Sequence, residues 1–191
     1  MSGSCRDSAP ALSESQAKPK RKLNRLSGYD YSTENAYFIT ACIENREHTF
    51  GRVVEDKVEL SKQGEIVKRR ISGIPDFFSE VSVLESVIMP NHLHCILMIG
   101  DKGKTLSQIV QSLKSACTRQ AKKEGAKLMW QRSFYDHIIR DEESYCRIAE
   151  YIRNNPLKWS VDVENIKDRK AEEYYAEVIF GKRNAAGGSG K

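Results

Sequence analysis

MPNHLHCILMIG, residues 89–100, is the stretch of this sequence that most constrains the fold. Its segment 93–99 is almost wholly apolar, which is typical of a central strand covered on both faces. The preceding segment VSVLESVIMP, residues 81–90, also predicts a strand, and Pro90-Asn91 predicts a tight connection. We therefore expect two consecutive strands joined by a short turn.

The elements before this pair follow from composition and periodicity. AYFITACIEN, residues 36–45, is β-branched and aromatic and predicts a strand, and a second short strand is expected over 53–60. Residues 61–74 place their apolar side chains on one side, as a helix does, and Gly73 and Pro75 are expected to end that helix.

Residues 105–124 give the clearest helical pattern, and Thr105 with Gln108 fits a capping box. Residues 134–141 alternate as a strand does, and Asp141 can cap a final helix over 142–154. The order β(β)αββαβα predicts an α+β fold, with an antiparallel or mixed sheet and helices on one face.

The length of 191 residues suits one ordinary domain. We expect a disordered basic arm over 1–27, one folded domain over 28–160, and a C-terminal helix with a flexible tail over 161–191. No apolar run approaches the ~18 residues of a membrane span, and the N-terminus does not resemble a secretory signal. The five cysteines are widely spaced and form no CxxC pair, which favours a reducing, cytoplasmic compartment.

The net charge of +5 is unevenly distributed. Residues 1–26 carry six basic and two acidic side chains, and residues 102–132 carry eight basic and one acidic side chain. These segments could follow a phosphate backbone, or they could be a solubilising arm and a solvated helix face. Charge alone favours the second interpretation.

The two histidines of the central strand are the first candidates for chemistry. Because residues i and i+2 of a strand point to one face, His92 and His94 present their imidazoles side by side while Leu93 faces away. Two neutral imidazoles can share a divalent ion if a third ligand comes from elsewhere. The alternative is a hydrogen-bonded structural pair.

A second candidate lies on the last predicted helix. Tyr151 and Asn155 are four residues apart, so they share one edge of the helix and could both reach the adjacent sheet. The alternative is a tyrosine at the rim of the core and an asparagine that ends the helix before Pro156.

Taken together, four segments resemble the single-tyrosine HUH transposases, and most closely the REP-associated tyrosine transposases. The resemblance runs from about Leu23 to Trp159, and four motifs in this order are far more specific than any one of them. The segments are Arg25–Tyr31 before Tyr37-Phe38-Ile39-Thr40, Met89–His94, Trp130–His137 and Tyr151–Pro156.

The resemblance implies a sheet of ferredoxin-like or RRM-like topology and a metal-dependent enzyme that cuts and rejoins DNA. His92 and His94 would match the histidines of the HUH motif, Asn155 the third metal ligand, and Tyr151 the nucleophile. The substrate would be single-stranded or hairpin DNA, cut through a 5′-phosphotyrosine intermediate without a nucleotide cofactor. Two imidazoles, an amide oxygen, phosphate and water would suit Mg²⁺ or Mn²⁺.

Candidates for DNA contact follow from residue type. Long basic side chains can reach phosphates, and exposed aromatic rings can stack on unpaired bases. On this basis we expect backbone contacts from Lys114, Arg119, Arg132 and Arg140, and stacking by Trp130, with Phe134 and Tyr135 as further candidates.

Several alternatives stay open at this point. Tyr145 is a less favoured candidate for the nucleophile, His137 is expected to be structural, and His48 is expected to be solvated. A catalytically silent DNA-binding protein on the same fold is the main rival, although a binder needs neither the two histidines nor Tyr151 and Asn155. An RNA-binding module of the RRM type is a third, and the chain is compatible with a monomer or a homodimer.

Overall fold

The computed structural model describes residues 28–100, 103–162, 164–165 and 174–175. The predicted basic arm over 1–27 lies outside these residues, as does most of the predicted C-terminal helix and tail. The long elements are β1 (Asn35–Cys42), β2 (Gly51–Val54), β3 (Lys57–Leu60), α1 (Lys62–Ser72), α2 (Ile74–Phe77), β4 (Val81–Ile88), β5 (His92–Ile99), α3 (Leu106–Lys123), β6 (Tyr135–Ile139) and α4 (Glu142–Asn154). Short 3-10 turns, η1 (Glu44–Arg46) and η2 (Pro156–Val161), follow β1 and α4.

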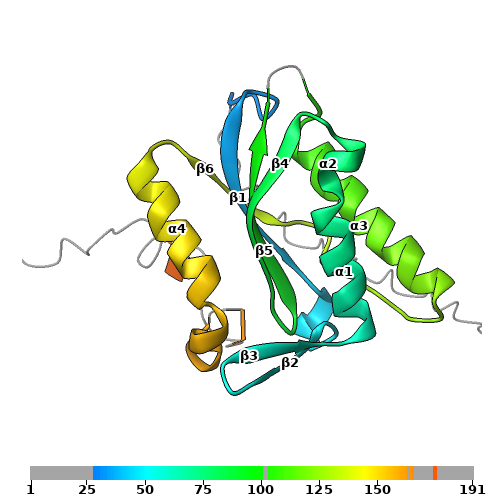
Figure 1. Cartoon of the computed structure of the whole chain (residues 1–191). Helices are drawn as coiled ribbons and strands as arrows, with labels where there is room; N and C mark the ends of the chain where they lie inside the picture. The colour runs from blue at the N-terminus through cyan, green and yellow to red at the C-terminus, as the bar shows by residue number, and fades with distance from the viewer. Residues whose placement is uncertain (1–27, 101–102, 163, 166–173, 176–191) are drawn as a thin grey trace, which may run out of the picture.

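The main sheet has four strands in the order β4-β5-β1-β6, and every neighbouring pair is antiparallel (Figure 1). If the β2–β3 hairpin is set aside, the chain order βαββαβ and this strand order give the ferredoxin-like topology. The predicted α+β class and antiparallel sheet are confirmed. As expected for a central strand, β5 is buried along its length except at Met98.

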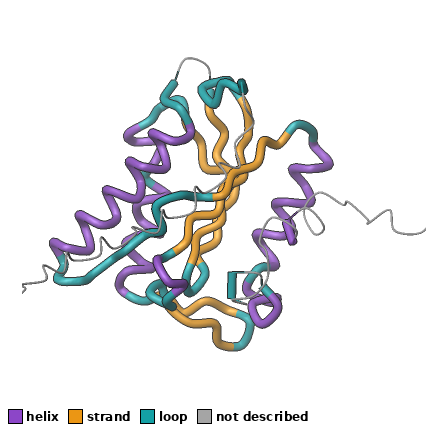
Figure 2. The backbone as a smooth tube through the Cα atoms, turned by 180° about the vertical axis from the view of Figure 1, so that it is seen from behind, coloured by secondary structure: helices purple, strands orange, loops and turns teal. Residues whose placement is uncertain are grey.

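The two faces of the sheet are covered by different helices (Figure 2). Leu93, Cys95 and Leu97 of β5 pack into a core with the apolar sides of α1 and α3. Ile96 and Phe38 belong instead to a second cluster under α4. The expectation that all helices cover one face is therefore wrong, because α4 packs on the opposite face from α1 and α3.

Local signals account for most element ends. Thr105 and Gln108 form the predicted capping box of α3, and the Asp141 side chain accepts from the Ser144 N–H at 2.7 Å at the start of α4. The strand expected over 53–60 is instead the hairpin β2–β3, because Glu55 and Asp56 adopt φ of 48° and 61° and reverse the chain. Pro75 lies in the first turn of α2 rather than simply ending α1.

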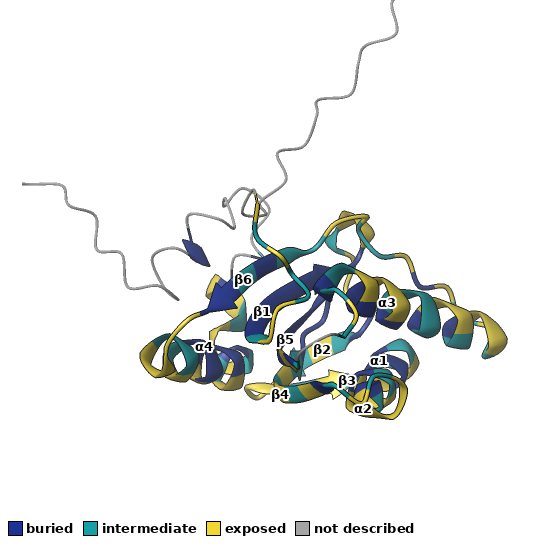
Figure 3. Cartoon of the chain, turned by 90° about the horizontal axis from the view of Figure 1, so that it is seen from above, coloured by how far each residue is buried: buried dark blue, intermediate teal, exposed yellow. Residues whose placement is uncertain are grey.

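The described helices are each too short or too polar to cross a lipid bilayer. Their outward sides are exposed, while β1 and β5 are buried between the two layers of helices (Figure 3). The face of β5 that meets α4 is the one that carries the two histidines.

Candidate functional site

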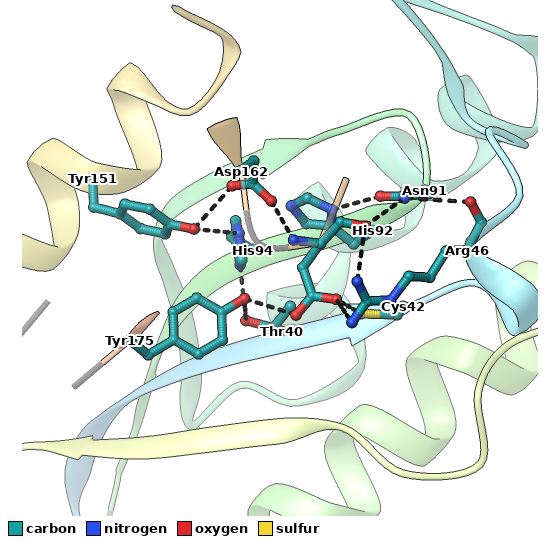
Figure 4. A network of polar contacts seen from close by, with 10 residues as sticks. Thr40, Cys42, Arg46, Asn91, His92, His94, Tyr151, Asp162 and Tyr175 are labelled. Carbon is teal, nitrogen blue, oxygen red and sulfur yellow. Dashed lines mark hydrogen bonds and ion pairs between the residues drawn. The ribbon is translucent and has the colours of Figure 1, made fainter. Parts of the chain in front are cut away.

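His92 and His94 lie side by side on the α4 face of β5, as the strand period predicts, and their ring centroids are 4.3 Å apart (Figure 4). Both side chains are fully buried. Leu93 between them points into the core on the other face. The strand therefore contributes a packing residue and two polar residues from three consecutive positions.

The hydrogen bonds of Asn91 fix which nitrogen of His92 carries the proton. The Asn91 Nδ2 donates to the backbone oxygens of Glu164 at 2.9 Å and Arg46 at 3.3 Å. The Asn91 Oδ1 therefore faces His92 Nδ1, at 2.8 Å, and accepts a hydrogen bond from its N–H. This leaves the lone pair of His92 on Nε2, a buried atom with no hydrogen-bond partner among the described residues.

His94 is oriented from β1. Thr40 lies directly opposite His94 in the β1–β5 register, and its Oγ1 is 2.8 Å from His94 Nδ1. The other ring nitrogen, Nε2, is 3.2 Å from the hydroxyl of Tyr151. Both histidines are thus tied through Nδ1 and present Nε2 toward the space under α4.

Burial keeps both imidazoles uncharged. It lowers the pKa of His92 to about 3, with a smaller effect of the Arg46 charge. Burial also holds the pKa of His94 well below its usual value, assisted by His92 and opposed by Asp162. Neutral imidazole with a free Nε2 is the form that binds a metal ion.

Tyr151 reaches the histidines from the buried side of α4. Its ring packs edge-on against Phe38, with centroids 6.3 Å apart, and its hydroxyl is 3.2 Å from Asp162 Oδ2. Burial first, and then the Asp162 carboxylate, raise the pKa of the phenol far above its usual value. The hydroxyl is therefore protonated, and it can share its hydrogen bond between the Asp162 carboxylate and the Nε2 of His94, each 3.2 Å away.

Asn155 lies one turn after Tyr151, at the end of α4, and the predicted shared edge is observed. Its Nδ2 donates to Asp162 Oδ2 at 2.8 Å, the same oxygen that Tyr151 contacts. Its Oδ1 is buried and has no hydrogen-bond partner among the described residues. Two unpartnered acceptors, on His92 and Asn155, are what a bound cation would satisfy.

Asp162 completes the group and was not foreseen. It is fully buried after η2, and its ligand atom lies within 4.8 Å of those of His92 and His94. Its Oδ1 accepts from the Glu164 N–H at 2.7 Å. Residues beyond the predicted domain end at 160 therefore line the site, and no periodicity in that part of the sequence signals them. Two imidazoles with an amide and a carboxylate oxygen form a donor set that fits a divalent cation.

The rim of the site also holds an aromatic residue that sequence reasoning passed over. Trp159 in η2 is half-buried, with its ring centroid 6.1 Å from His92 and 5.4 Å from His48. His137 lies on the α4 face of β6, where burial lowers its pKa to about 4. Tyr145 packs at the margin of the cluster under α4.

The residues predicted to contact DNA are not gathered at the histidines. Lys114 and Arg119 are on α3, on the opposite face of the sheet, where the Lys114 Nζ donates to the backbone oxygens of Gln131 and Ser133. Trp130 packs against Phe50, with ring centroids 5.3 Å apart.

Two arginines are exposed at opposite ends of the sheet. Arg132 follows Gln131, whose N–H donates to the Cys42 oxygen, next to His92 in the register. Arg140 follows Ile139, which pairs with Ala36, roughly 20 Å along β1 from Cys42. DNA contact by any of these side chains stays a prediction.

Two histidines flanking one apolar residue on a sheet strand, met by one tyrosine from a helix, define the class of single-tyrosine HUH proteins. The family model described as "Transposase IS200 like" matches residues 33–155, and the chain belongs to this family.

The chain is also similar to two relatives and to one solved structure. An uncharacterized protein of Haemophilus influenzae is 40% identical, over 74% of this chain and 91% of that relative. A putative REP-associated tyrosine transposase of the same organism is 25% identical, over 80% and 88% of the two chains. A solved structure of a REP-associated tyrosine transposase bound to a REP hairpin is 21% identical, covers 72% of this chain and 74% of that one, and has a TM-score of 0.55, which supports the fold.

Proposed function

We propose that this protein cleaves and rejoins single-stranded or hairpin DNA by transesterification, with Tyr151 as the nucleophile. One observation carries the proposal: the Tyr151 hydroxyl lies 3.2 Å from the Nε2 of His94, inside a buried set of metal-type donors. The hairpin DNA in the related solved structure supports the choice of substrate.

His92 and His94 would hold a divalent cation through Nε2, and we assign the third position to Asn155 Oδ1. Asp162 could also supply that oxygen. Its Oδ2 already accepts from Tyr151 and Asn155, and its Oδ1 accepts from the Glu164 N–H, whereas Asn155 Oδ1 has no described partner. The cation, Mg²⁺ or Mn²⁺, would polarise the scissile phosphate and offset charge in the transition state.

The residues of the chain then account for the proton and the bonds. Tyr151 passes its proton to Asp162 Oδ2, at 3.2 Å, as its oxygen bonds to phosphorus. The phosphorus–O3′ bond breaks, and the departing oxygen takes up the proton that Asp162 received, directly or through water, to become a 3′-hydroxyl. The 5′-phosphotyrosine keeps the phosphodiester energy, so that a 3′-hydroxyl can reverse the step.

A covalent trap tests the proposal. The full chain is incubated with 3′-end-labelled single-stranded hairpin DNA and Mn²⁺ and analysed on a denaturing gel, because only the DNA on the 3′ side of the cut stays bound to the tyrosine. We expect a labelled protein band that disappears in Tyr151→Phe and persists in Tyr145→Phe, a matched change on the same helix. An adduct that survives Tyr151→Phe would disprove the assignment of the nucleophile.

The same experiment addresses the rival class. If the protein binds hairpin DNA in a mobility-shift assay, yet the wild type forms no adduct with any hairpin tested, the chain is a DNA-binding protein that has lost catalysis.

Exposed Arg132 and Arg140 are the proposed backbone contacts, and Trp130 with Lys114 and Arg119 are weaker candidates because of where the fold places them.

A further inference from the structure

The carboxylate of Glu164 lies almost fully buried beside the site, beyond the part of the chain that the family model matches. Its Oε1 accepts from the Tyr175 hydroxyl at 3.0 Å, and its Oε2 accepts from the Cys42 thiol at 3.3 Å. The Arg46 guanidinium is 3.3 Å from Oε2 and balances the charge. The carboxylate is thus held by groups from β1, from η1 and from the C-terminal segment.

A line of hydrogen bonds joins this carboxylate to His94, and Figure 4 shows its members Tyr175, Thr40 and His94. The Tyr175 hydroxyl donates to Glu164, and it lies 3.4 Å from Thr40 Oγ1, which donates to it. Thr40 Oγ1 is in turn 2.8 Å from His94 Nδ1. Three contacts therefore separate the carboxylate from the ring that Tyr151 touches.

The carboxylate sets the direction of the whole line, because an ionised carboxylate can only accept. Tyr175 must donate to it, so the lone pair of the phenol is free to accept from Thr40. The Thr40 hydroxyl donates to Tyr175, so its oxygen must accept from His94 Nδ1. The proton of His94 is therefore on Nδ1, and the lone pair of Nε2 faces the cation position and accepts from the Tyr151 hydroxyl, which lies at the same distance from Asp162 Oδ2.

We infer that Glu164 is a positioning residue that holds His94 in the Nδ1-protonated, ligand-competent tautomer through Tyr175 and Thr40. The backbone oxygen of Glu164 also accepts from Asn91 Nδ2, the group that orients His92. One residue thus supports the partners of both histidines. The inference deepens the proposed function, since it assigns the device that prepares the proposed ligands.

Variants that remove one member of this line of hydrogen bonds should reverse the direction of the remaining bonds. In Glu164→Ala the Tyr175 hydroxyl loses its acceptor and can turn to donate to Thr40, which then donates to His94 Nδ1. The ring is driven to the Nε2-protonated tautomer, in which the nitrogen facing the site cannot bind a metal. Tyr175→Phe cuts the line at its middle and frees Thr40 to make the same turn, without disturbing Arg46.

Nitrogen-15 NMR of the histidine rings distinguishes the Nδ1-protonated tautomer from the Nε2-protonated one directly. The chain has four histidines, so the full-length protein labelled with ¹⁵N-histidine gives few ring signals to assign. In metal-free wild type we expect His92 and His94 in the Nδ1-protonated form. In Glu164→Ala and Tyr175→Phe we expect His94 alone to change to the Nε2-protonated form. Glu164→Gln keeps a carbonyl acceptor for Tyr175 and should retain the wild-type signature for His94.

Titration with Mn²⁺ alone, followed by electron paramagnetic resonance, gives a second readout. Loss of an outer partner of a ligating histidine typically weakens metal binding about 10- to 100-fold, and we expect this range for Glu164→Ala and Tyr175→Phe. Tyr174→Phe, which removes the hydroxyl of the neighbouring tyrosine outside the line, should stay within about twofold of wild type.

The outcomes separate the two proposals. Retention of the Nδ1-protonated signal of His94 in both disrupting variants overturns the positioning role, whether or not the protein cuts DNA. A tautomer change without any covalent adduct in the wild type supports the positioning role and overturns the proposed catalysis. If Tyr174→Phe changes the His94 signal as strongly as Tyr175→Phe, the effect is one of general packing and the inference fails.

Discussion

The Tyr151 hydroxyl and the Nε2 of His94 lie 3.2 Å apart, although 57 positions separate them in the chain. The helix α4, which carries Tyr151, follows β6 in the chain and packs on the face of the sheet that carries His94. The contact brings the proposed nucleophile to an atom of a proposed metal ligand. It exists only because α4 covers the face opposite to α1 and α3.

The identity of the third ligand can be tested by comparing Asn155→Ala with Asp162→Asn. If Asn155 Oδ1 is the ligand, Asn155→Ala should weaken Mn²⁺ binding by about 10-fold or more, because it removes a direct donor. Asp162→Asn should weaken it less and mainly slow adduct formation, since the proton acceptor for Tyr151 is lost. Calorimetric titration measures the Mn²⁺ affinity of each variant, and the covalent trap measures its rate of adduct formation. The opposite ranking in the titration would place the Asp162 carboxylate on the metal.

Leu93 should behave as a core residue despite its place between the two histidines. Leu93→Ala removes a fully buried side chain and is expected to lower the free energy of unfolding by about 2–5 kcal/mol. Urea denaturation measures this loss. Leu84→Ala, at a position 38% exposed on β4, should cost well under that range. Equal losses in the two variants would contradict the assignment of β5 as the central, doubly covered strand.

Stability of the metal-free protein should fall as the pH drops below about 6.5. The folded chain keeps His92 neutral down to a pKa of about 3 and His137 neutral down to about 4, whereas the unfolded chain protonates both near 6.5. The unfolded state therefore binds more protons between these values. A fully buried histidine adds up to about 1.4 kcal/mol of destabilisation per pH unit, and the partly exposed His137 adds less.

Chemical denaturation in EDTA at pH 7, 6 and 5 measures this dependence. The midpoint should fall at each step, and His137→Gln should make the fall shallower because one of the protonating groups is gone. A midpoint that is constant from pH 7 to 5 would show that the histidines are not held neutral by the fold.

Lys114 should contribute more to the fold than to DNA binding. Its ammonium group donates to two backbone oxygens of the segment before β6 and lies 5.9 Å from the Trp130 ring and 5.7 Å from the Phe134 ring. Burial lowers its pKa to about 8. We expect Lys114→Met to lower the free energy of unfolding by about 1–3 kcal/mol, from the lost charged hydrogen bonds.

Arg132→Ala is the matched comparison, because Arg132 is exposed near the end of the sheet at which His92 lies. It should weaken binding of labelled hairpin DNA and reduce its salt dependence while leaving stability within about 0.5 kcal/mol. A larger loss of DNA affinity in Lys114→Met than in Arg132→Ala, measured on folded protein, would instead support the predicted phosphate contact of Lys114.

Local sequence patterns predict many features of the fold and of the candidate site. The alternation of a strand suffices to put His92 and His94 on one face, and the spacing of a helix suffices to put Tyr151 and Asn155 on one edge. The caps at Thr105 and Asp141 depend on residues three positions apart, so they too are visible in the sequence. Each of these features is decided within one element.

What escaped prediction depends on how elements meet. The apolar side of α4 shows which part of the helix is buried, but not which face of the sheet it covers. Asp162 and Glu164 reach the site because η2 turns the chain back after Asn155, and nothing in their own neighbourhood distinguishes a buried carboxylate from a solvated one. The turn at Glu55 and Asp56 was missed because neither residue is the glycine or asparagine that usually marks such a turn.

The placement of the two tryptophans allows intrinsic fluorescence to report on the site. Trp159 lies 6.1 Å from His92, whereas Trp130 packs against Phe50 and belongs to the core on the other side of the sheet. Paramagnetic Mn²⁺ at the histidines should quench the emission of Trp159 far more than that of Trp130. Trp130→Phe would then leave a single emitter, whose intensity reports occupancy of the site in real time and without any label.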